Sequence, residues 1–434
     1  RDVAVGLVGS EMCIRDSFRP KSVAAGTLDF RLTWGLGGMA AVLIFNQFAT
    51  GILLKFVYQP TAAGAYHSID ALQNGLLFGR LIRNLHYWGA NLLLPLVLLH
   101  MLRVFYTGAY GSPRRGTWLV GLALLATVLT ANFSGYLLPW DQLAYWATTV
   151  WTAMLGYVPL VGEPLQLALR SGNEVGQASL QLFYTLHTAM VPALLLLLLP
   201  YHFWRIRKAG GLVVPRLPDE PPDPSPPRVP AWPDLLIRET ATGLCLMAFL
   251  MMRAVLFNAP LGDPANPGLS PNPTKAPWFM AGFQELLLHM HPLFAALVIP
   301  GLVVGALIWL PFARYPKNTA GVWFASSAGR TTSIMAAAVA LVMTPAAIFV
   351  SDKVLRPNGW GAWMPPLIHE GLLPTVLLMA AAAAVYAAVR IRWQGDKNEA
   401  VQAVFTLFVV SWVMMTVTCV WFRGAQMALG WPWG

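Results

Sequence analysis

Cysteine is scarce in this sequence. Only three of its 434 residues are cysteines, at Cys13, Cys245 and Cys419. They are too few and too scattered for a disulfide framework or for a cysteine-ligated iron–sulfur cluster. The motif Cys-x-x-Cys-His does not occur in the sequence, which excludes the ordinary covalent attachment of a c-type haem.

Charged side chains are scarce as well. They make up 11% of the residues, whereas hydrophobic residues make up 56%. This composition predicts an all-α, polytopic membrane protein rather than a soluble domain. The net charge of +10 is therefore interpreted as a topology signal. No basic stripe interleaved with aromatic residues is present, so we expect no nucleic-acid partner.

The beginning of the sequence is unusual for a chain of this kind. Residues 1–17 fit neither a signal peptide nor an amphipathic arm. They resemble translated read-through of a sequencing adaptor or an assembly artefact. We expect them to be non-native, and the functional argument leaves them out together with Cys13.

Apolar stretches long enough to cross a bilayer predict nine transmembrane helices. They lie at about 33–55, 82–106, 117–139, 180–204, 235–257, 286–312, 331–351, 367–390 and 401–423. A proline-rich stretch at 211–233 is expected to be a cytoplasmic linker with neither helix nor strand. It separates a four-helix domain at 27–210 from a second region at 234–313, which further helices and a tail follow at 314–434.

The distribution of lysine and arginine predicts the orientation. The side that holds the N-terminus and the connections after the second, fourth, sixth and eighth stretches carries roughly twice as many of these residues as the other side. The positive-inside rule places that side in the cytoplasm. We expect a multi-pass protein of a bacterial inner membrane with a cytoplasmic N-terminus.

Four histidines within the predicted helices carry the functional argument. His100 follows His86 at position i+14, and His202 follows His187 at position i+15. In an α-helix, a step from i to i+14 rises about 21 Å and turns to within roughly 40° of four complete turns. Each helix therefore places two imidazoles on one face, near opposite sides of the membrane. Two such helices can hold two stacked planar metal cofactors, whereas histidines that only pack would not need this matched spacing.

Glycines on the other two helices repeat the same spacing. Gly51 follows Gly37 at position i+14, and Gly135 follows Gly121 at the same interval. A residue without Cβ lets a flat macrocycle come close to the backbone, although glycine also permits tight helix packing in membranes. Two pairs at the histidine spacing favour the macrocycle. Ligation by two imidazoles leaves haem iron without an open position, which suits electron transfer.

Residues 27–210 resemble the N-terminal half of the cytochrome b/b6 family, the membrane core of quinol–cytochrome c oxidoreductases. The resemblance rests on the histidine and glycine pairs, on Arg83 before His86, on Gly-Tyr-Leu-Leu-Pro-Trp-Asp-Gln at 135–142 and on Tyr145–Trp146. It implies two non-covalent b-type haems whose iron is ligated by His86 with His187 near the outer face and by His100 with His202 near the cytoplasm. It also implies that Arg83 and Arg207 contact the cofactors.

The resemblance further implies an outer quinol-oxidising site, with quinone or quinol as the substrate. Its expected residues lie in the loop before and after residue 140 and in the loop that ends near residue 278: Tyr136, Pro139, Trp140, Trp146, Pro277 and Trp278. The family carries Pro-Glu-Trp-Tyr here, but Pro277 stands in place of the glutamate that accepts a proton. Glu285 and His289, one turn apart at the expected start of a helix, are candidate replacements. The alternative is that Glu285 only caps or solvates that helix.

These inferences lead to one preferred function and one alternative. The preferred function is a dihaem cytochrome b subunit that carries electrons from quinol oxidation in a bc-type complex. Its expected partners are a Rieske-type iron–sulfur protein, a c-type cytochrome, the quinone pool and a second copy of the complex. Gly35 stands where relatives with a third, covalently held haem have cysteine, so no third haem of that kind is expected. The alternative is a non-bifurcating electron conduit for another peripheral oxidoreductase.

Overall fold

The computed structural model describes residues 21–29, 33–218, 220–221 and 225–431; the expected non-native segment 1–17 lies outside them. Within the described part, nine helical spans are long and apolar enough to cross a membrane. They are Leu36–Lys55, Gly79–Tyr106, Arg115–Leu137, Gln177–Lys208, Ala231–Leu256, Phe294–Phe312, Ser327–Leu355, Leu367–Arg392 and Lys397–Phe422. The predicted all-α, polytopic membrane architecture is confirmed.

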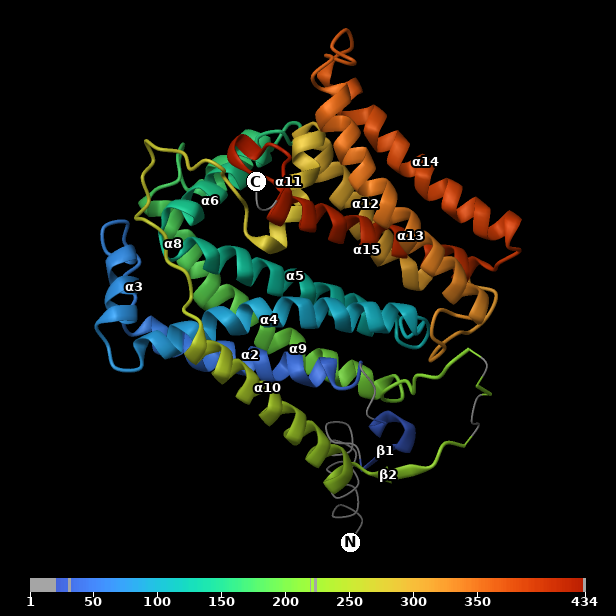
Figure 1. Ribbon diagram of the computed structural model, residues 1–434. Coiled ribbons are helices and arrows are strands. Elements are labelled where there is room, and N and C mark those ends of the chain that lie inside the picture. The colour runs from blue at the N-terminus through green and yellow to red at the C-terminus, as the bar shows by residue number, and fades with distance from the viewer. Residues whose placement is uncertain (1–20, 30–32, 219, 222–224, 432–434) are drawn as a thin grey trace.

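The first four spans form a bundle. Helix α2 (Leu36–Lys55) packs against α4 (Gly79–Tyr106), and α5 (Arg115–Leu137) packs against α9 (Val191–Lys208). The four helices run side by side across the molecule (Figure 1). Leucine and valine side chains of all four helices meet in the largest buried cluster. The bundle therefore brings together the four helices on which the histidine and glycine pairs lie.

The fourth span contains a π turn, which accounts for its different histidine spacing. Helix α8 (Gln177–Thr185) continues through η2 (Leu186–Met190) into α9, and the Val191 N–H bonds the carbonyl of Leu186, five residues earlier. A π turn inserts one residue relative to a regular helix. The longer step from His187 to His202 therefore spans nearly the same length and rotation as the step from His86 to His100.

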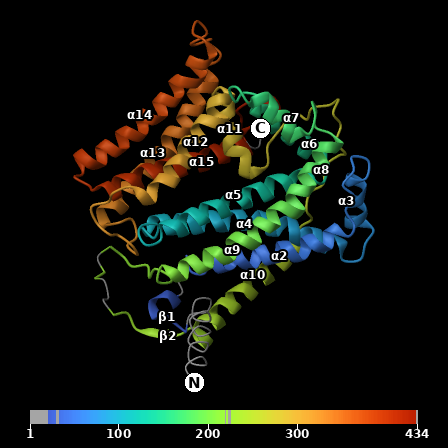
Figure 2. The ribbon, with the colours of Figure 1, turned by 180° about the vertical axis from the view of Figure 1, so that it is seen from behind.

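Shorter elements cover the two ends of the bundle. Helix α3 (Ala65–Asn74) and helices α6 (Gln142–Leu155) and α7 (Gly162–Arg170) lie at one end (Figures 1 and 2). At the other end, β1 (Ser22–Ala24), followed by the turn η1 (Ala25–Leu28), pairs with β2 (Arg228–Pro230). The expectation that 211–233 holds neither helix nor strand was wrong, because β2 lies within it and a helical segment begins at Ala231. Proline lacks an N–H to donate but keeps its carbonyl acceptor, and the end of a short edge strand tolerates that loss.

The second half begins with η3 (Ala231–Leu235) and α10 (Leu236–Leu256), which packs on α4 and α2. It continues through α11 (Trp278–His289), η4 (Phe294–Val298), α12 (Ile299–Trp309) and η5 (Leu310–Phe312). The last spans are α13 (Ser327–Val350) with η6 (Ser351–Leu355), then η7 (Leu367–Leu372), α14 (Leu373–Ala387) and η8 (Ala388–Arg392), then α15 (Lys397–Phe422) and the turn η9 (Ala425–Met427). Helix α15 packs between α13 and α11.

One boundary differs from the sequence-based expectation. Helix α11 ends at His289, and Met290 is extended with φ −136° and ψ 151°. The sixth span begins only at Phe294. Glu285 and His289 therefore lie on a separate short helix and not at the start of the membrane span. Apolar residues continue through this break, so hydropathy alone does not mark it.

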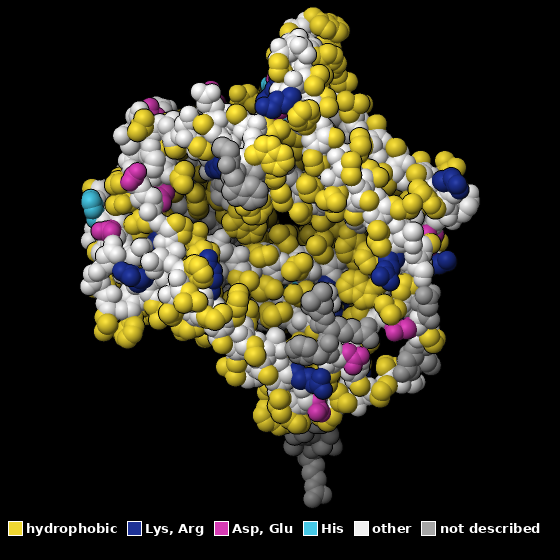
Figure 3. All heavy atoms as spheres, viewed as in Figure 1, with side chains coloured by type: hydrophobic (Ala, Val, Ile, Leu, Met, Phe, Trp, Pro, Cys, Tyr) yellow, Lys and Arg dark blue, Asp and Glu magenta, His cyan; other side chains and the backbone are white. Residues whose placement is uncertain are grey.

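The surface is what a membrane protein requires. Hydrophobic side chains cover much of the centre and right of the face in Figure 3, and charged side chains are few and scattered on it. Large apolar side chains such as Phe45, Leu197 and Leu377 are more than half exposed. In water such a surface would be a strong aggregation liability, whereas in a bilayer it faces lipid.

Candidate functional site

His86 and His187 face each other at one end of the bundle. Their ring centroids are 6.1 Å apart, and the ring planes are inclined by 78°. A metal ion bonds an imidazole nitrogen at about 2 Å, so two rings opposed across one ion have centroids roughly 6 Å apart. This pair, which is called the outer pair after the side of the membrane expected from the sequence, thus has the separation that a shared metal centre requires.

Hydrogen bonds define the tautomer of both outer histidines. The Thr50 hydroxyl donates to the carbonyl of Asn46 at 2.7 Å, so its oxygen accepts from His86 Nδ1 at 2.9 Å. The carbonyl of Ala131 accepts from His187 Nδ1 at 3.1 Å. With the proton on Nδ1, the lone pair of each ring lies on Nε2, where it can bond a metal.

The inner pair lies at the other end of α4 and α9. Nδ1 of His100 and Nδ1 of His202 are buried and have no hydrogen-bond partner among the described residues. The carbonyl of Thr117 lies near the His202 ring but outside hydrogen-bonding geometry at Nδ1. The two pairs therefore differ in what surrounds Nδ1.

Two arginines at the inner end hold buried nitrogens that the described part of the chain does not satisfy. They are Nε of Arg103 and Nη1 of Arg207. A buried guanidinium nitrogen without a partner is costly, and an anionic acceptor relieves that cost. The acidic edge of a haem would fit there. Arg207 was expected from the sequence, whereas Arg103, one turn beyond His100, was overlooked.

Each of the four glycines faces one histidine. A Cβ built on Gly37 or on Gly51 would lie 3.3 Å from Cε1 of His100 or His86, respectively. A Cβ on Gly121 would lie 3.5 Å from Cε1 of His202, and one on Gly135 would lie 2.6 Å from Cε1 of His187. The glycines thus make room for the imidazole rings of the neighbouring helix. From the sequence, this room was expected to serve only the macrocycle.

Arg83 joins the two halves of the chain. It is buried, and its guanidinium donates to the carbonyls of Ala259 at 2.7 Å and Pro260 at 2.6 Å and to the side chain of Gln73. Next to it, Asn84 donates to the carbonyl of Ala254 at 2.7 Å. These bonds tie α4 to the end of α10. The terminal nitrogens of Arg83 are thereby occupied by protein groups, and its expected contact with a cofactor stays a prediction.

The two loops expected to form the quinol site lie together. Between α5 and α6, Asp141 accepts from the Gly262 N–H at 3.1 Å, and the Trp140 carbonyl accepts from the Ala265 N–H at 3.1 Å. The Gln142 carboxamide accepts from the Asn266 N–H at 2.6 Å. The loop between α10 and α11 is therefore held against residues 140–142, although the two loops are far apart in the sequence.

The six residues expected at the quinol site divide among different environments. Trp140 is buried against Tyr145, and Trp146 donates to the Asn266 carbonyl at 3.3 Å. Trp278 begins α11 and donates to the side chain of Asn91 at 2.7 Å. Tyr136 and Pro139 flank the end of α5, and Pro277 is the residue before α11. All six belong to the joined loops and their helix ends.

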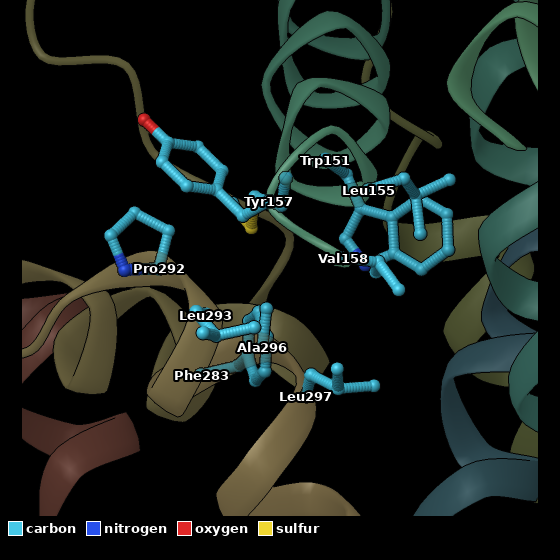
Figure 4. A pocket seen from close by; sticks show the side chains of 10 residues that line it. Trp151, Leu155, Tyr157, Val158, Phe283, Pro292, Leu293, Ala296 and Leu297 are labelled. Carbon is cyan, nitrogen blue, oxygen red and sulfur yellow. The ribbon is translucent and has the colours of Figure 1, made fainter. Parts of the chain in front are cut away.

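A hollow lies at the C-terminal end of α6, whereas residues 140–142 of the junction lie at the N-terminal end of that helix. It has a volume of about 60 Å³ and lies between α6 with its following turn and α11 with η4 (Figure 4). Its lining is almost entirely apolar: Trp151, Met154, Leu155, Tyr157, Val158, Phe283, Pro292, Leu293, Ala296 and Leu297. None of the six expected residues lines it. Tyr157 and the neighbouring His291, whose rings meet edge to face at 5.6 Å, were not recognised as site residues from the sequence.

Comparison with known proteins assigns the family. The protein-family model described as cytochrome b/b6/petB matches residues 24–210 of the chain. Cytochrome b6 from a Synechocystis species is 41% identical over 175 residues, which are 40% of this chain and 79% of that protein. The chain belongs to the cytochrome b/b6 family.

Two further likenesses extend this result. Cytochrome b6 from a Synechococcus species is 39% identical over 197 residues, which are 45% of this chain and 89% of that protein. A solved structure described as a hyperthermophilic respiratory Complex III matches with a TM-score of 0.65 over 95% of this chain and 98% of that chain, at 22% identity. The sequence likeness thus covers the four-helix bundle, and the likeness in fold includes the second half of the chain.

Glu285 and His289 lie in a buried charge cluster. Arg423, which follows α15, donates from Nε to Glu285 Oε2 at 3.0 Å and from Nη2 to Glu285 Oε1 at 2.5 Å, and it also pairs with Asp352. His289 lies 3.1 Å from Glu285 through Nε2 and 2.8 Å from the Ser351 hydroxyl through Nδ1. Arg423 is the residue that the sequence argument missed, because it lies 138 positions from Glu285.

The charge cluster determines the protonation of Glu285. Burial raises the pKa of this carboxyl, but the hydrogen bonds from His289 and Arg423 and the charge of Arg423 outweigh burial, so the pKa lies below its usual value. Burial lowers the pKa of Arg423, and its bonds to Glu285 and Asp352 more than reverse that effect. Glu285 and Arg423 are therefore an ionised pair at neutral pH.

Proposed function

We propose that the chain is a dihaem cytochrome b that carries electrons across the membrane from quinol oxidation, as the membrane subunit of a bc-type complex. The observation that supports this most directly is the pairing of His86 with His187 at 6.1 Å in a bundle where four glycines each admit one imidazole ring. Haem, when bound by such pairs, accepts and passes on one electron at a time.

Each residue of the proposed cage has a stated task. His86 and His187, whose Nδ1 atoms are hydrogen-bonded, would ligate the outer iron through Nε2, and His100 with His202 would ligate the inner one. Arg103 and Arg207 would neutralise the acidic groups of the inner haem through their buried nitrogens. The step from His86 to His100 on α4 separates the two sites by about 21 Å along the helix, a path that spans most of the hydrocarbon layer.

We infer that quinol binds on the outer side, where the loop after α5 meets the loop before α11. The apolar hollow between the C-terminal end of α6 and α11 with η4 suits a quinone ring and tail, because such sites are mostly apolar with few polar groups. At about 60 Å³ it holds the volume of only about two water molecules. Binding therefore requires α6 and η4 to move apart.

Glu285 and His289 are proposed to take the proton that Pro277 cannot. Both carboxylate oxygens of Glu285 accept from Arg423, so proton acceptance is assigned to His289 and the orientation of its ring to Glu285. Nη2 of Arg423 also lies 3.1 Å from His289 Nε2. Glu285 and His289 both lie on the face of α11 toward α13 and α15, whereas Phe283 faces the hollow. Quinol oxidation in Glu285→Gln, with the exposed Glu370→Gln as the matched control, tests this role; a normal rate in Glu285→Gln refutes it.

A second candidate function rests on Pro277. This residue has no titratable group where the family carries a glutamate, which favours a chain that passes electrons between the quinone pool and another peripheral oxidoreductase without bifurcation. Purification with associated subunits distinguishes the two. A Rieske-type protein and a c-type cytochrome support the bc-type complex, whereas multihaem cytochromes or a molybdoenzyme support the conduit.

The proposal includes a setting in the cell. We infer a bacterial cytoplasmic membrane, a cytoplasmic N-terminus and a homodimeric complex. The decisive experiment is a reduced-minus-oxidised spectrum with haem quantification. Two b-type haems per chain are expected, one of them lost in His86→Leu and the other in His100→Leu. A purified protein without haem, or one whose haems survive both substitutions, refutes the proposed function.

A further inference from the structure

The glycine repeat extends to the residues that precede each glycine. On α2, Thr50 precedes Gly51 at the outer site and Leu36 precedes Gly37 at the inner site. On α5, Ser134 precedes Gly135 and Val120 precedes Gly121. The two ends of the bundle are therefore related by the same i to i+14 shift along both helices. A hydroxyl stands at each outer position, and an apolar side chain stands at each inner one.

Both outer hydroxyls are acceptors for a histidine. The Thr50 hydroxyl donates its own proton to the Asn46 carbonyl at 2.7 Å, so the nitrogen is the donor in the bond of 2.9 Å between His86 Nδ1 and Thr50. Ser134 donates to the Thr130 carbonyl at 2.6 Å and lies 3.2 Å from His187 Nδ1. The same His187 proton also points to the Ala131 carbonyl at 3.1 Å. Among the described residues, Nδ1 of His86 thus has one acceptor, Thr50, whereas Nδ1 of His187 has two.

The inner histidines have no matching hydroxyls. Leu36 and Val120 offer no acceptor, and neither His100 Nδ1 nor His202 Nδ1 finds a hydrogen-bond partner in the described ranges. Thr117, which is the counterpart of Ala131 in the repeat, brings its carbonyl near His202 without completing the bond. The difference between the two sites therefore follows from side-chain type at equivalent positions.

This difference has a chemical consequence for a ligated iron. An imidazole whose Nδ1–H is hydrogen-bonded is a more basic ligand through Nε2. A more basic ligand stabilises the oxidised, more positive metal and lowers its reduction potential, and hydrogen bonds around the axial ligands are one of the ways in which a protein sets that potential.

We propose that Thr50 and Ser134 are positioning residues that lower the reduction potential of the outer haem relative to the inner one. The inference rests on the proposed function, because it presupposes haem at both histidine pairs. It assigns to two hydroxyls the task of making electron transfer from the outer to the inner site favourable. Neither residue touches the iron; each acts through the imidazole that does.

The test is a redox titration of the purified holoprotein, in which the two haems are followed by their visible spectra. Thr50→Val removes the one acceptor that the described part of the chain gives His86 Nδ1, and Ser134→Ala leaves His187 with the Ala131 carbonyl. Losing one such bond is expected to favour reduction of the outer haem by about three- to tenfold. This change raises its reduction potential by roughly 30–60 mV, at 59 mV per tenfold. Ser134→Ala should give the smaller shift, and the inner haem should not change.

Three further variants complete the design. Thr50→Ser keeps the hydroxyl and should retain the original potential. Thr130→Val makes a similar change on α5, where the Thr130 hydroxyl donates to the Ala126 carbonyl and not to a histidine; the Thr130 carbonyl, which accepts from Ser134, is kept, so neither haem should shift. Val120→Ser places a hydroxyl beside His202, and it should lower the potential of the inner haem. This last variant keeps the inference testable if Thr50→Val fails to retain the outer haem.

The possible outcomes separate the inference from the function on which it rests. Two haems with unshifted potentials in Thr50→Val, Ser134→Ala and Val120→Ser would overturn the inference and leave the dihaem function intact. Equal shifts of both haems in any of these variants would also overturn it, because a local bond acts on one site. A starting protein without b-type haem would instead refute the proposed function.

Discussion

Replacing Gly135 by alanine should disrupt the outer haem site selectively. The new Cβ would lie 2.6 Å from Cε1, 3.1 Å from Nδ1 and 3.2 Å from Nε2 of His187. Ordinary carbon contacts are about 3.5–4.0 Å, so the ring or α5 must move by roughly 1 Å. Overpacking of this kind costs about 1–3 kcal/mol, which weakens haem retention by about five- to 150-fold if it falls on the ligated state.

The other three glycines that face a histidine supply the matched controls. A Cβ on Gly121 would lie 3.5 Å from Cε1 of His202, which is an ordinary contact, and a Cβ on Gly37 or Gly51 would lie 3.3 Å from its histidine. We therefore expect Gly121→Ala to be tolerated, Gly37→Ala and Gly51→Ala to be mildly impaired, and Gly135→Ala to be the most severe.

The assay is the ratio of haem to protein in purified samples, combined with the reduced-minus-oxidised spectrum. Gly135→Ala should approach one haem per chain, with the remaining spectrum that of the inner site. If Gly135→Ala kept two haems with native spectra while Gly121→Ala lost one, the glycines would not be spacers for the imidazole rings.

Three further predictions concern the second half and the quinol site. Arg423→Met leaves Glu285 charged and buried with only His289 of its two described partners, so it should lower the free energy of unfolding by about 3–5 kcal/mol, measured by thermal denaturation in detergent; joint replacement with Glu285→Met should restore most of the loss. Bonds from His289 and Arg423 hold the pKa of Glu285 below its usual value. The stability that Glu285 contributes should therefore be complete above the usual glutamate range and decline as the pH falls through the lowered pKa. If stability depended on pH in the same way in Glu285→Gln as in the unaltered protein, this expectation would be contradicted. His289→Gln should slow quinol oxidation more than His291→Gln if the proton leaves toward α13 and α15, and the reverse order would place the proton acceptor beside Tyr157.

Hydropathy was sufficient to predict the membrane spans, but it did not reveal the break at Met290 within the span expected at 286–312. The expected boundaries lie within a few residues of most spans because a run of about 20 apolar residues in a bilayer has only the helix available. At Met290 the chain turns out of the helix while remaining apolar. Nothing in the local hydropathy distinguishes such a break from a continuous span. The proline-rich segment failed differently, since β2 exists because β1, which lies before the first span, supplies its partner.

The candidate site divides in the same way. Helix periodicity places His86 and His100 on one face of their helix and Gly121 and Gly135 on one face of theirs. The sequence was therefore enough to recognise each pair. The pairing of Arg423 with Glu285 could not be anticipated, because charge complementarity does not say which of many distant residues will meet. Arg103 could have been found, since it lies one turn from His100 on the same helix and faces the same end of the bundle.

By itself the sequence determined which helices exist, which of their faces carry histidine or glycine, and where hydroxyls stand in that repeat, because the geometry of a single helix converts spacing directly into direction. Only the tertiary structure decided which glycine faces which imidazole, that the π turn at η2 absorbs the extra residue before His202, and that Arg423 neutralises Glu285. Those outcomes depend on the relative placement of helices, which is determined by packing across the whole chain and not by periodicity within one segment.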